Sequence, residues 1–88
     1  MENITDFLMN GRENAIPMSD LALMLNLPER TLRQEILNAR LKGELIVSND
    51  QGYFLPSCQE DLKEYVNVRK ARIRTSVQAL RPFIKAIR

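Results

Sequence analysis

The most constraining feature of this sequence is one amphipathic segment held between a proline and a glycine, residues 28–43. Proline is tolerated at a helix start, and glycine is the usual residue just past a helix end. Between them, Leu32, Ile36 and Ala39 recur at helical spacing and fall on one side of a helical wheel. The sequence therefore predicts a helix over about residues 28–42 that buries one face and exposes the other.

The opposite face of this predicted helix carries side chains of the kinds that recognise nucleic acids. Arginine forms paired hydrogen bonds with guanine, glutamine and asparagine do the same with adenine, and threonine suits a phosphate oxygen. The candidate DNA-binding residues are Arg30, Thr31, Arg33, Gln34 and Asn38. The alternative explanation of the same residues is a solvated polar face, which any amphipathic helix needs.

Two leucines interrupt this outward face. Leu37 and Leu41 lie one turn apart, next to Arg30 and Gln34. A recognition helix that is free in solution should not expose such a pair. We expect the long C-terminal helix of the same chain to cover them; the alternative is a subunit interface.

Shorter elements are expected before this helix. A short helix over residues 3–10 should bury Ile4, Phe7 and Leu8. A second helix over residues 18–26, capped near Ser19, should use an apolar stripe to pack on the helix at 28–42. The predicted stripe consists of Leu21, Met24 and Leu25.

The segment after Gly43 predicts a β-hairpin. Two β-prone runs, "ELIVS" and "GYFLP", are joined by the turn residues "NDQ", and the tip carries Asp50 but no lysine or arginine. Alternation along the strands predicts a common face formed by Leu45, Val47, Tyr53 and Leu55. The expected core of both helices and the hairpin is Leu21, Leu25, Leu32, Ile36, Val47 and Tyr53.

A long C-terminal helix is expected next. The run "SCQE" matches a capping box in which Ser57 pairs with Glu60, and the helix can continue from about Gln59 to Arg81. Pro82 should then kink or end it. The domain division is residues 1–56 for the hairpin-containing domain and residues 57–88 for the basic amphipathic helix.

This C-terminal helix combines an apolar seam with cations. Ile73, Val77 and Leu80 recur at spacings of four and three, as at a helix–helix interface. Three interpretations remain open: a homodimer positioned for two half-sites on DNA, docking on a different protein, or contact with an anionic membrane surface. The arginines can also simply keep the helix soluble.

Charge and composition limit the function classes. Residues 1–58 hold five Lys/Arg and eight Asp/Glu, residues 59–88 hold eight and three, and nothing acidic follows Glu64. Any attraction to polyanions should therefore concentrate at the C-terminus.

Histidine is absent, which argues against an enzyme, a metal site or a cofactor. The single cysteine, Cys58, fits a reducing cytoplasm and a small buried residue, and no apolar run suits a bilayer.

Taken together, the stretch "SDLALMLNLPERTLRQEILNARLKGELIVSNDQGYFL" resembles the winged helix-turn-helix of the biotin-repressor N-terminal-domain type. The likeness rests on a "Leu-x-x-x-Thr-Leu-Arg" helix start and on a glycine–aromatic return strand. The matching positions are Leu27, Thr31, Leu32, Arg33, Ile36, Gly43, Ile46, Gly52, Tyr53 and Phe54. The whole is also similar to small phage and prophage proteins that add a basic C-terminal helix.

The resemblance implies a mainly α fold with a small β-hairpin, a winged helix-turn-helix extended by a long C-terminal helix. It implies sequence-dependent binding of double-stranded DNA by a small phage-type transcriptional regulator or replication accessory. The alternative is a protein–protein adaptor that keeps the winged-helix fold and binds partners through Leu37, Leu41 and the C-terminal seam. The hairpin tip lacks cations, which argues against phosphate contact by the hairpin.

Overall fold

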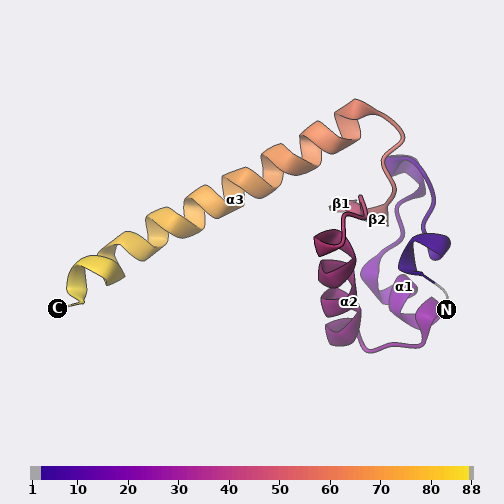
Figure 1. The fold of residues 1–88 in the computed structure, drawn as a ribbon, viewed down its shortest axis with the longest axis horizontal. Helices are drawn as coiled ribbons and strands as arrows, with labels where there is room; N and C mark the ends of the chain where they lie inside the picture. Colours follow the sequence, from indigo (N-terminus) through magenta and orange to yellow (C-terminus); the bar gives the residue numbers. More distant parts are fainter. Residues whose placement is uncertain (1–2, 88) are drawn as a thin grey trace.

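The computed structural model describes residues 3–87, in which a helix-turn-helix and a hairpin are followed by one long helix (Figure 1). The predicted fold class, mainly α with a small β-hairpin and a long C-terminal helix, is confirmed. In chain order the elements are the 3₁₀ helices η1 (Ile4–Phe7) and η2 (Arg12–Asn14), the helices α1 (Met18–Leu25) and α2 (Glu29–Leu41), the strands β1 (Val47–Asn49) and β2 (Gly52–Phe54), and the helix α3 (Gln59–Ala86).

A tight turn joins α1 to α2. Asn26 takes the left-handed conformation, with φ of 54°, and so ends α1. Asparagine is one of the few residues that adopt this conformation at low cost. The N–H of Leu27 donates to the carbonyl of Ala22 at 3.0 Å, and Pro28 leads into α2 in an extended conformation. The turn thus fixes how the two helices meet.

The core lies between α1, α2 and the segment that leads into the hairpin. As predicted, α2 buries Leu32, Ile36 and Ala39, and it ends before Gly43, whose φ is 100°. The largest side chains that are almost fully buried are Leu21, Leu32, Ile36 and Ile46.

Two details of the predicted α1 are wrong. Met24 is 51% exposed, because Leu21, Ala22 and Leu25 form one continuous arc of the helix and Met24 lies outside that arc. The residue that precedes the helix is Pro17, and no side chain caps this end, so Ser19 is not the N-cap.

The hairpin has two faces that are covered by different elements. Val47 pairs with Phe54, and Ser48 pairs with Tyr53, so Val47 and Tyr53 point to opposite faces. Tyr53 packs against the helical core, whereas Val47 and Phe54 are buried on the other side, where α3 packs on β1. The hairpin therefore connects the core to α3.

The predicted common face of Leu45, Val47, Tyr53 and Leu55 is accordingly wrong, and Leu45 is 60% exposed. The sequence pattern counts three turn residues, 49–51, whereas Asn49 still pairs with Gly52 and leaves a turn of two. A change of one residue in the turn length shifts the strand pairing by one residue. The side chains of one strand then point to the opposite face of the hairpin relative to those of the partner strand.

A third extended segment ties the hairpin to the loop before α1. Ile16 and Tyr53 exchange both backbone hydrogen bonds, each at 2.9 Å. Gly52 has φ of 137°, and a Cβ at this position would collide with the backbone carbonyl of Ile16. Only glycine suits this close approach of two backbones.

The first turn of α3 is capped differently from the prediction. Both the backbone N–H and the hydroxyl of Ser57 donate to Asp61 Oδ2, at 3.0 and 3.1 Å, so the partner of Ser57 is Asp61 and not Glu60. The difference is one residue, because Cys58 is the N-cap and Asp61 is therefore the third helical residue. Cys58 itself is exposed, contrary to the expected small buried residue.

Beyond its first turns, α3 leaves the rest of the molecule (Figure 1). It continues through Pro82 to Ala86, so it does not end at the proline. Every residue from Val66 to Ile87 is exposed. The radius of gyration is 15.6 Å, whereas a compact chain of this length would have about 12 Å. In the following sections, residues 3–65 are called the body and residues 66–87 the arm.

Candidate nucleic-acid interface

The outward face of α2 presents all five candidate DNA-binding side chains to solvent. These exposed residues are Arg30, Thr31, Arg33, Gln34 and Asn38. Among residues 3–87, neither Arg30 nor Arg33 takes part in an ion pair, and the Gln34 amide donates to Asn38 Oδ1 at 3.1 Å. Because the opposite face of α2 is buried, these groups stand on a helix that is fixed in place.

Arg33 lies beside the hairpin tip. It lines a cavity of about 310 Å³ together with residues of the α1 start and the hairpin, among them Asn49, Asp50 and Gln51. The tip is itself ordered by a hydrogen bond from the Gln51 N–H to Asn49 Oδ1, at 2.8 Å. A ligand that reaches Arg33 therefore also meets the hairpin, whose tip contributes a carboxylate and two amides but no cation.

Leu37 and Leu41 are not covered by α3. They are 48% and 77% exposed, so the expected cover from the same chain is wrong. The reason is the direction of α3, which begins on the hairpin, passes beyond the C-terminal end of α2 and then moves away from it (Figure 1). The outward face of α2 is thus polar toward its N-terminal half and apolar toward its C-terminal half.

Arg40 holds three elements together and is not free to bind a phosphate. Its Nε donates to the Ile46 carbonyl at 2.8 Å, and its guanidinium lies over the rings of Tyr53 and Tyr65, 5.9 and 5.0 Å from their centres. Burial lowers the pKa of this guanidinium from its usual value. Cation–π contacts of this kind stabilise a partly desolvated cation. Arg40 therefore joins α2 to the hairpin and to α3.

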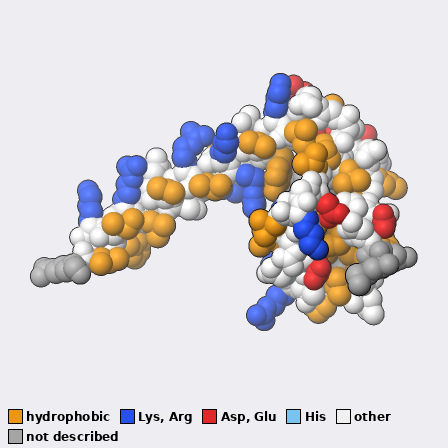
Figure 2. Space-filling model, viewed as in Figure 1, with side chains coloured by type: hydrophobic (Ala, Val, Ile, Leu, Met, Phe, Trp, Pro, Cys, Tyr) orange, Lys and Arg blue, Asp and Glu red, His pale blue; other side chains and the backbone are white. Residues whose placement is uncertain are grey.

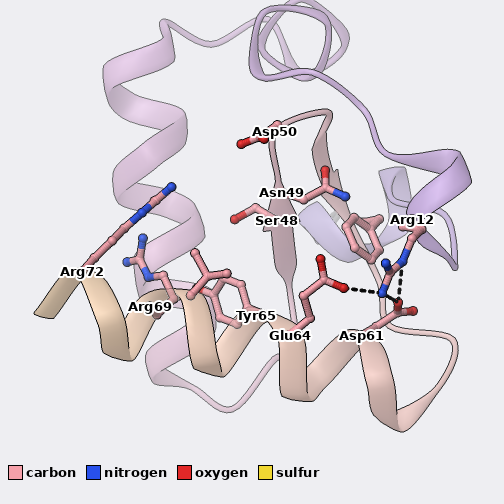
Figure 3. A pocket seen from close by; sticks show the side chains of 11 residues that line it. Arg12, Ser48, Asn49, Asp50, Asp61, Glu64, Tyr65, Arg69 and Arg72 are labelled. Carbon is pink, nitrogen blue, oxygen red and sulfur yellow. Dashed lines mark hydrogen bonds and ion pairs between the residues drawn. The ribbon is translucent and has the colours of Figure 1, made fainter. Parts of the chain in front are cut away.

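Two further arginines approach α2 from α3. Arg69 and Arg72 line a cavity of about 160 Å³ with residues of β1, and Figure 3 shows both side chains rising from α3 toward α2 and the hairpin. The guanidinium of Arg69 lies 5.8 Å from the centre of the Tyr65 ring. The sequence alone gives no reason to separate Arg69 and Arg72 from the other cations of the C-terminal helix. Only the helical position relative to Tyr65, which packs on the body, could have distinguished them from the other cations.

An ion-pair cluster fixes the start of α3, at the other end of the same cavity (Figure 3). Arg12 Nη2 lies 2.9 Å from Asp61 Oδ1 and 2.6 Å from Glu64 Oε2. The hydrogen bonds from Ser57 and from Arg12 lower the pKa of the Asp61 carboxyl, and the same carboxylates raise the pKa of Arg12. This cluster, which joins distant parts of the sequence, sets the direction in which α3 departs.

The three predicted interface residues of the arm are exposed as well. Ile73, Val77 and Leu80 are 61%, 50% and 53% exposed. Figure 2 shows hydrophobic side chains running along α3, with lysine and arginine side chains gathered on the edge that faces away from α2. No other part of residues 3–87 covers them.

Residues 3–87 contain no group of three or more His, Cys, Asp and Glu side chains that could hold a metal ion. None of the helices described combines the length and the apolar character that a bilayer span requires.

Comparison of the chain with protein families, with curated proteins and with solved structures found no match.

Proposed function

We propose that this protein binds double-stranded DNA and that α2 enters the major groove. The observation that carries the proposal is the outward face of α2, where Arg30, Arg33, Gln34 and Asn38 are all exposed. The major groove is wide enough for a helix, and each base pair there presents its own pattern of donors and acceptors. These four side chains have the chemistry to read such a pattern.

Two arginines of α3 are placed to contact phosphates on the side of α2 that faces α3. Arg69 and Arg72 rise from α3 toward α2 and the hairpin (Figure 3), and arginine is well suited to bind phosphate oxygens. Each phosphate neutralised on duplex DNA releases counterions and steepens the salt dependence of binding. In this proposal, α2 supplies the base contacts and the two arginines position the duplex.

The remaining cations of the arm do not fit the same duplex. Helical spacing gathers Lys70, Arg74, Arg81 and Lys85 on one edge of α3, and the cations in Figure 2 follow the edge that faces away from α2. Phosphate contacts are therefore proposed for Arg69 and Arg72 only.

The biological setting of the proposal is the one that the resemblance to phage proteins implies. A small regulator of transcription or an accessory of replication needs sequence-dependent DNA binding and no catalytic group. A protein–protein adaptor remains the second candidate function, and the exposure of Ile73, Val77 and Leu80 on the arm is the observation that favours it.

Enrichment of binding sites from a random duplex pool tests the DNA proposal. We expect the wild-type protein to enrich a defined sequence with salt-dependent affinity. Arg33→Ala or Gln34→Ala should cost about 1–3 kcal/mol on the enriched site and relax specificity at one base pair. A folded protein that enriches no sequence, or an Arg33→Ala variant with unchanged affinity and specificity, would contradict the proposal.

A further inference from the structure

The arm presents an apolar strip that nothing in the body covers. Ile73, Val77, Leu80 and Ile84 follow one another at spacings of four, three and four residues, which places them on one side of α3. All four are at least half exposed, from 50% for Val77 to 62% for Ile84. The arm extends for about 33 Å at the helical rise.

An amphipathic helix whose apolar face is unpacked is only marginally stable in water. Helices in proteins owe most of their stability to packing of an apolar face, and the strip has no such packing within residues 3–87. The strip also follows the heptad rhythm of two-stranded coiled coils. The arm is therefore shaped for another helix.

The charges beside the strip determine which helix fits. Lys70, Arg74, Arg81 and Lys85 flank the strip on one edge, Arg69 lies on its other side, and no acidic residue follows Glu64. In coiled coils, the residues that flank the apolar seam form ion pairs across the interface and select the partner. The cations that flank the strip therefore favour a partner helix with glutamate or aspartate at the facing positions.

A second copy of this chain is disfavoured by the same charges. Two arms side by side would bring together flanks whose charged residues are all cations, and like charges placed opposite one another destabilise an interface. DNA held on α2 does not reach the cationic edge, since that edge faces away from α2 (Figure 2). The narrow strip also lacks tryptophan, which amphipathic membrane-surface helices often carry.

We propose that the arm binds an acidic amphipathic helix of a different protein as a two-stranded coiled coil. Ile73, Val77, Leu80 and Ile84 pack against the apolar seam of the partner, while the flanking lysines and arginines pair with its carboxylates. This proposal does not rest on DNA binding, because the strip residues of α3 are distinct from the α2 residues that are proposed to read bases.

A synthetic peptide of about four heptads provides the probe, with leucine at the seam positions and glutamate at the flanking positions. We expect the full-length protein to bind it with an affinity that falls as ionic strength rises. An otherwise identical peptide with lysine at the flanking positions should bind at least about tenfold more weakly, because its charges oppose those of the arm. Equal binding of the two peptides, or no binding of the acidic one, overturns the proposal.

Variants of the arm locate the binding. Val77→Glu should weaken binding of the acidic peptide at least about tenfold, because it buries an unpaired charge in the seam. Thr75→Glu introduces the same charge on the opposite side of the helix and should have a much smaller effect. The double variant Arg74→Glu/Arg81→Glu should reverse the preference and bind the lysine-flanked peptide. Equal losses for Val77→Glu and Thr75→Glu, or an unreversed preference, contradict a seam on this face.

Two controls test the other candidates for binding to the strip, which are a second copy of the chain and an anionic membrane. Sedimentation of the wild-type protein alone at tens of micromolar should show a monomer, and a dimer abolished by Val77→Glu would assign the strip to a second copy instead. Vesicles of anionic lipid should bind less well than the acidic peptide, and tighter binding to vesicles would assign it to a membrane. Duplex DNA binding by Val77→Glu should match that of the wild type, so loss of peptide binding is separable from failure of the DNA proposal.

Discussion

The body and the arm of this protein are stabilised in opposite ways. In the body, Leu21, Leu32, Ile36 and Ile46 are almost fully removed from water. In the arm, every residue from Val66 to Ile87 remains exposed although α3 is one unbroken helix. The comparison shows that the two surfaces proposed for binding have different mechanical supports: α2 is fixed by its buried face, whereas the arm depends on its partner for packing.

The junction between the two regions is built from charges and aromatic rings. Asp61 is the only buried charged residue of the described chain, and Arg12 and Ser57 hold its two oxygens. On the other side of the hairpin, Arg40 joins Tyr53 to Tyr65. These contacts belong to the body, so the direction of the arm is set before the arm begins.

The largest expected effect on stability is a truncation in the body. Ile36 is 2% exposed, and Ile36→Ala should destabilise the protein by about 2–5 kcal/mol through lost burial and a cavity. Denaturant unfolding of wild type and variant measures the change. Val77→Ala in the arm is the matched control and should change the free energy of unfolding by less than about 0.5 kcal/mol. Similar losses at both positions would show that the arm is packed in solution.

A smaller effect is expected at the junction, and it should depend on pH. The folded state lowers the pKa of Asp61, so the unfolded chain takes up a proton at this site more readily than the folded protein does. The stabilisation is therefore complete above the unfolded pKa of about 3.9 and is lost as pH falls through the lower, folded value.

Asp61→Asn should accordingly lower the denaturation midpoint at neutral pH, by less than Ile36→Ala does. Unfolding curves of wild type and Asp61→Asn should converge as pH falls below about 4. Glu60→Gln, which makes the same charge change on the neighbouring exposed residue, serves as the control. A gap between wild type and Asp61→Asn that is unchanged at acidic pH would refute the role given to the Asp61 carboxylate.

The smallest effect on global stability is expected at Pro82. Proline inside a helix removes one hydrogen bond and costs about 3 kcal/mol locally, but the arm makes few contacts that could transmit this gain to the body. Pro82→Ala should therefore increase the helical circular dichroism signal and slow amide exchange near the end of α3, while leaving the unfolding midpoint of the body unchanged. A shift of that midpoint would couple the arm to the core.

How far the sequence predicted this structure depended on how local each feature is. The buried face of α2 was predicted correctly, because helical periodicity between Pro28 and Gly43 contains the necessary information. The hairpin register was wrong, because it depends on whether the turn has two residues or three. Periodicity constrains which residues share a helical face much better than it constrains loop length.

Long-range features were beyond a pattern-based reading. The contact of Arg12 with Asp61 joins residues far apart in the chain. No local sequence pattern around either residue predicts this pairing. Leu37 and Leu41 were identified correctly as outward residues, but their cover depends on the direction of α3. That direction follows from the junction contacts, so neither it nor the position of Arg69 and Arg72 beside α2 could be derived from spacing. The seam spacing alone also predicts a homodimer, and our proposal of an acidic partner helix differs from it because of the like charges that flank the seam.

The central claim is that the two regions bind different ligands, duplex DNA on α2 and an acidic helix on the arm. The most direct test compares two variants that each remove two arginines, Arg30→Ala/Arg33→Ala on α2 and Arg74→Ala/Arg81→Ala on the arm. Fluorescence anisotropy of a labelled duplex measures their affinities at one fixed ionic strength.

The account predicts that the α2 variant loses at least about tenfold in duplex affinity, whereas the arm variant stays close to the wild type. Both variants should keep the wild-type unfolding midpoint, because all four arginines are exposed. Equal losses in the two variants would mean that DNA responds only to net charge. A larger loss in the arm variant would contradict the account, because it would assign DNA binding to the cationic edge of α3.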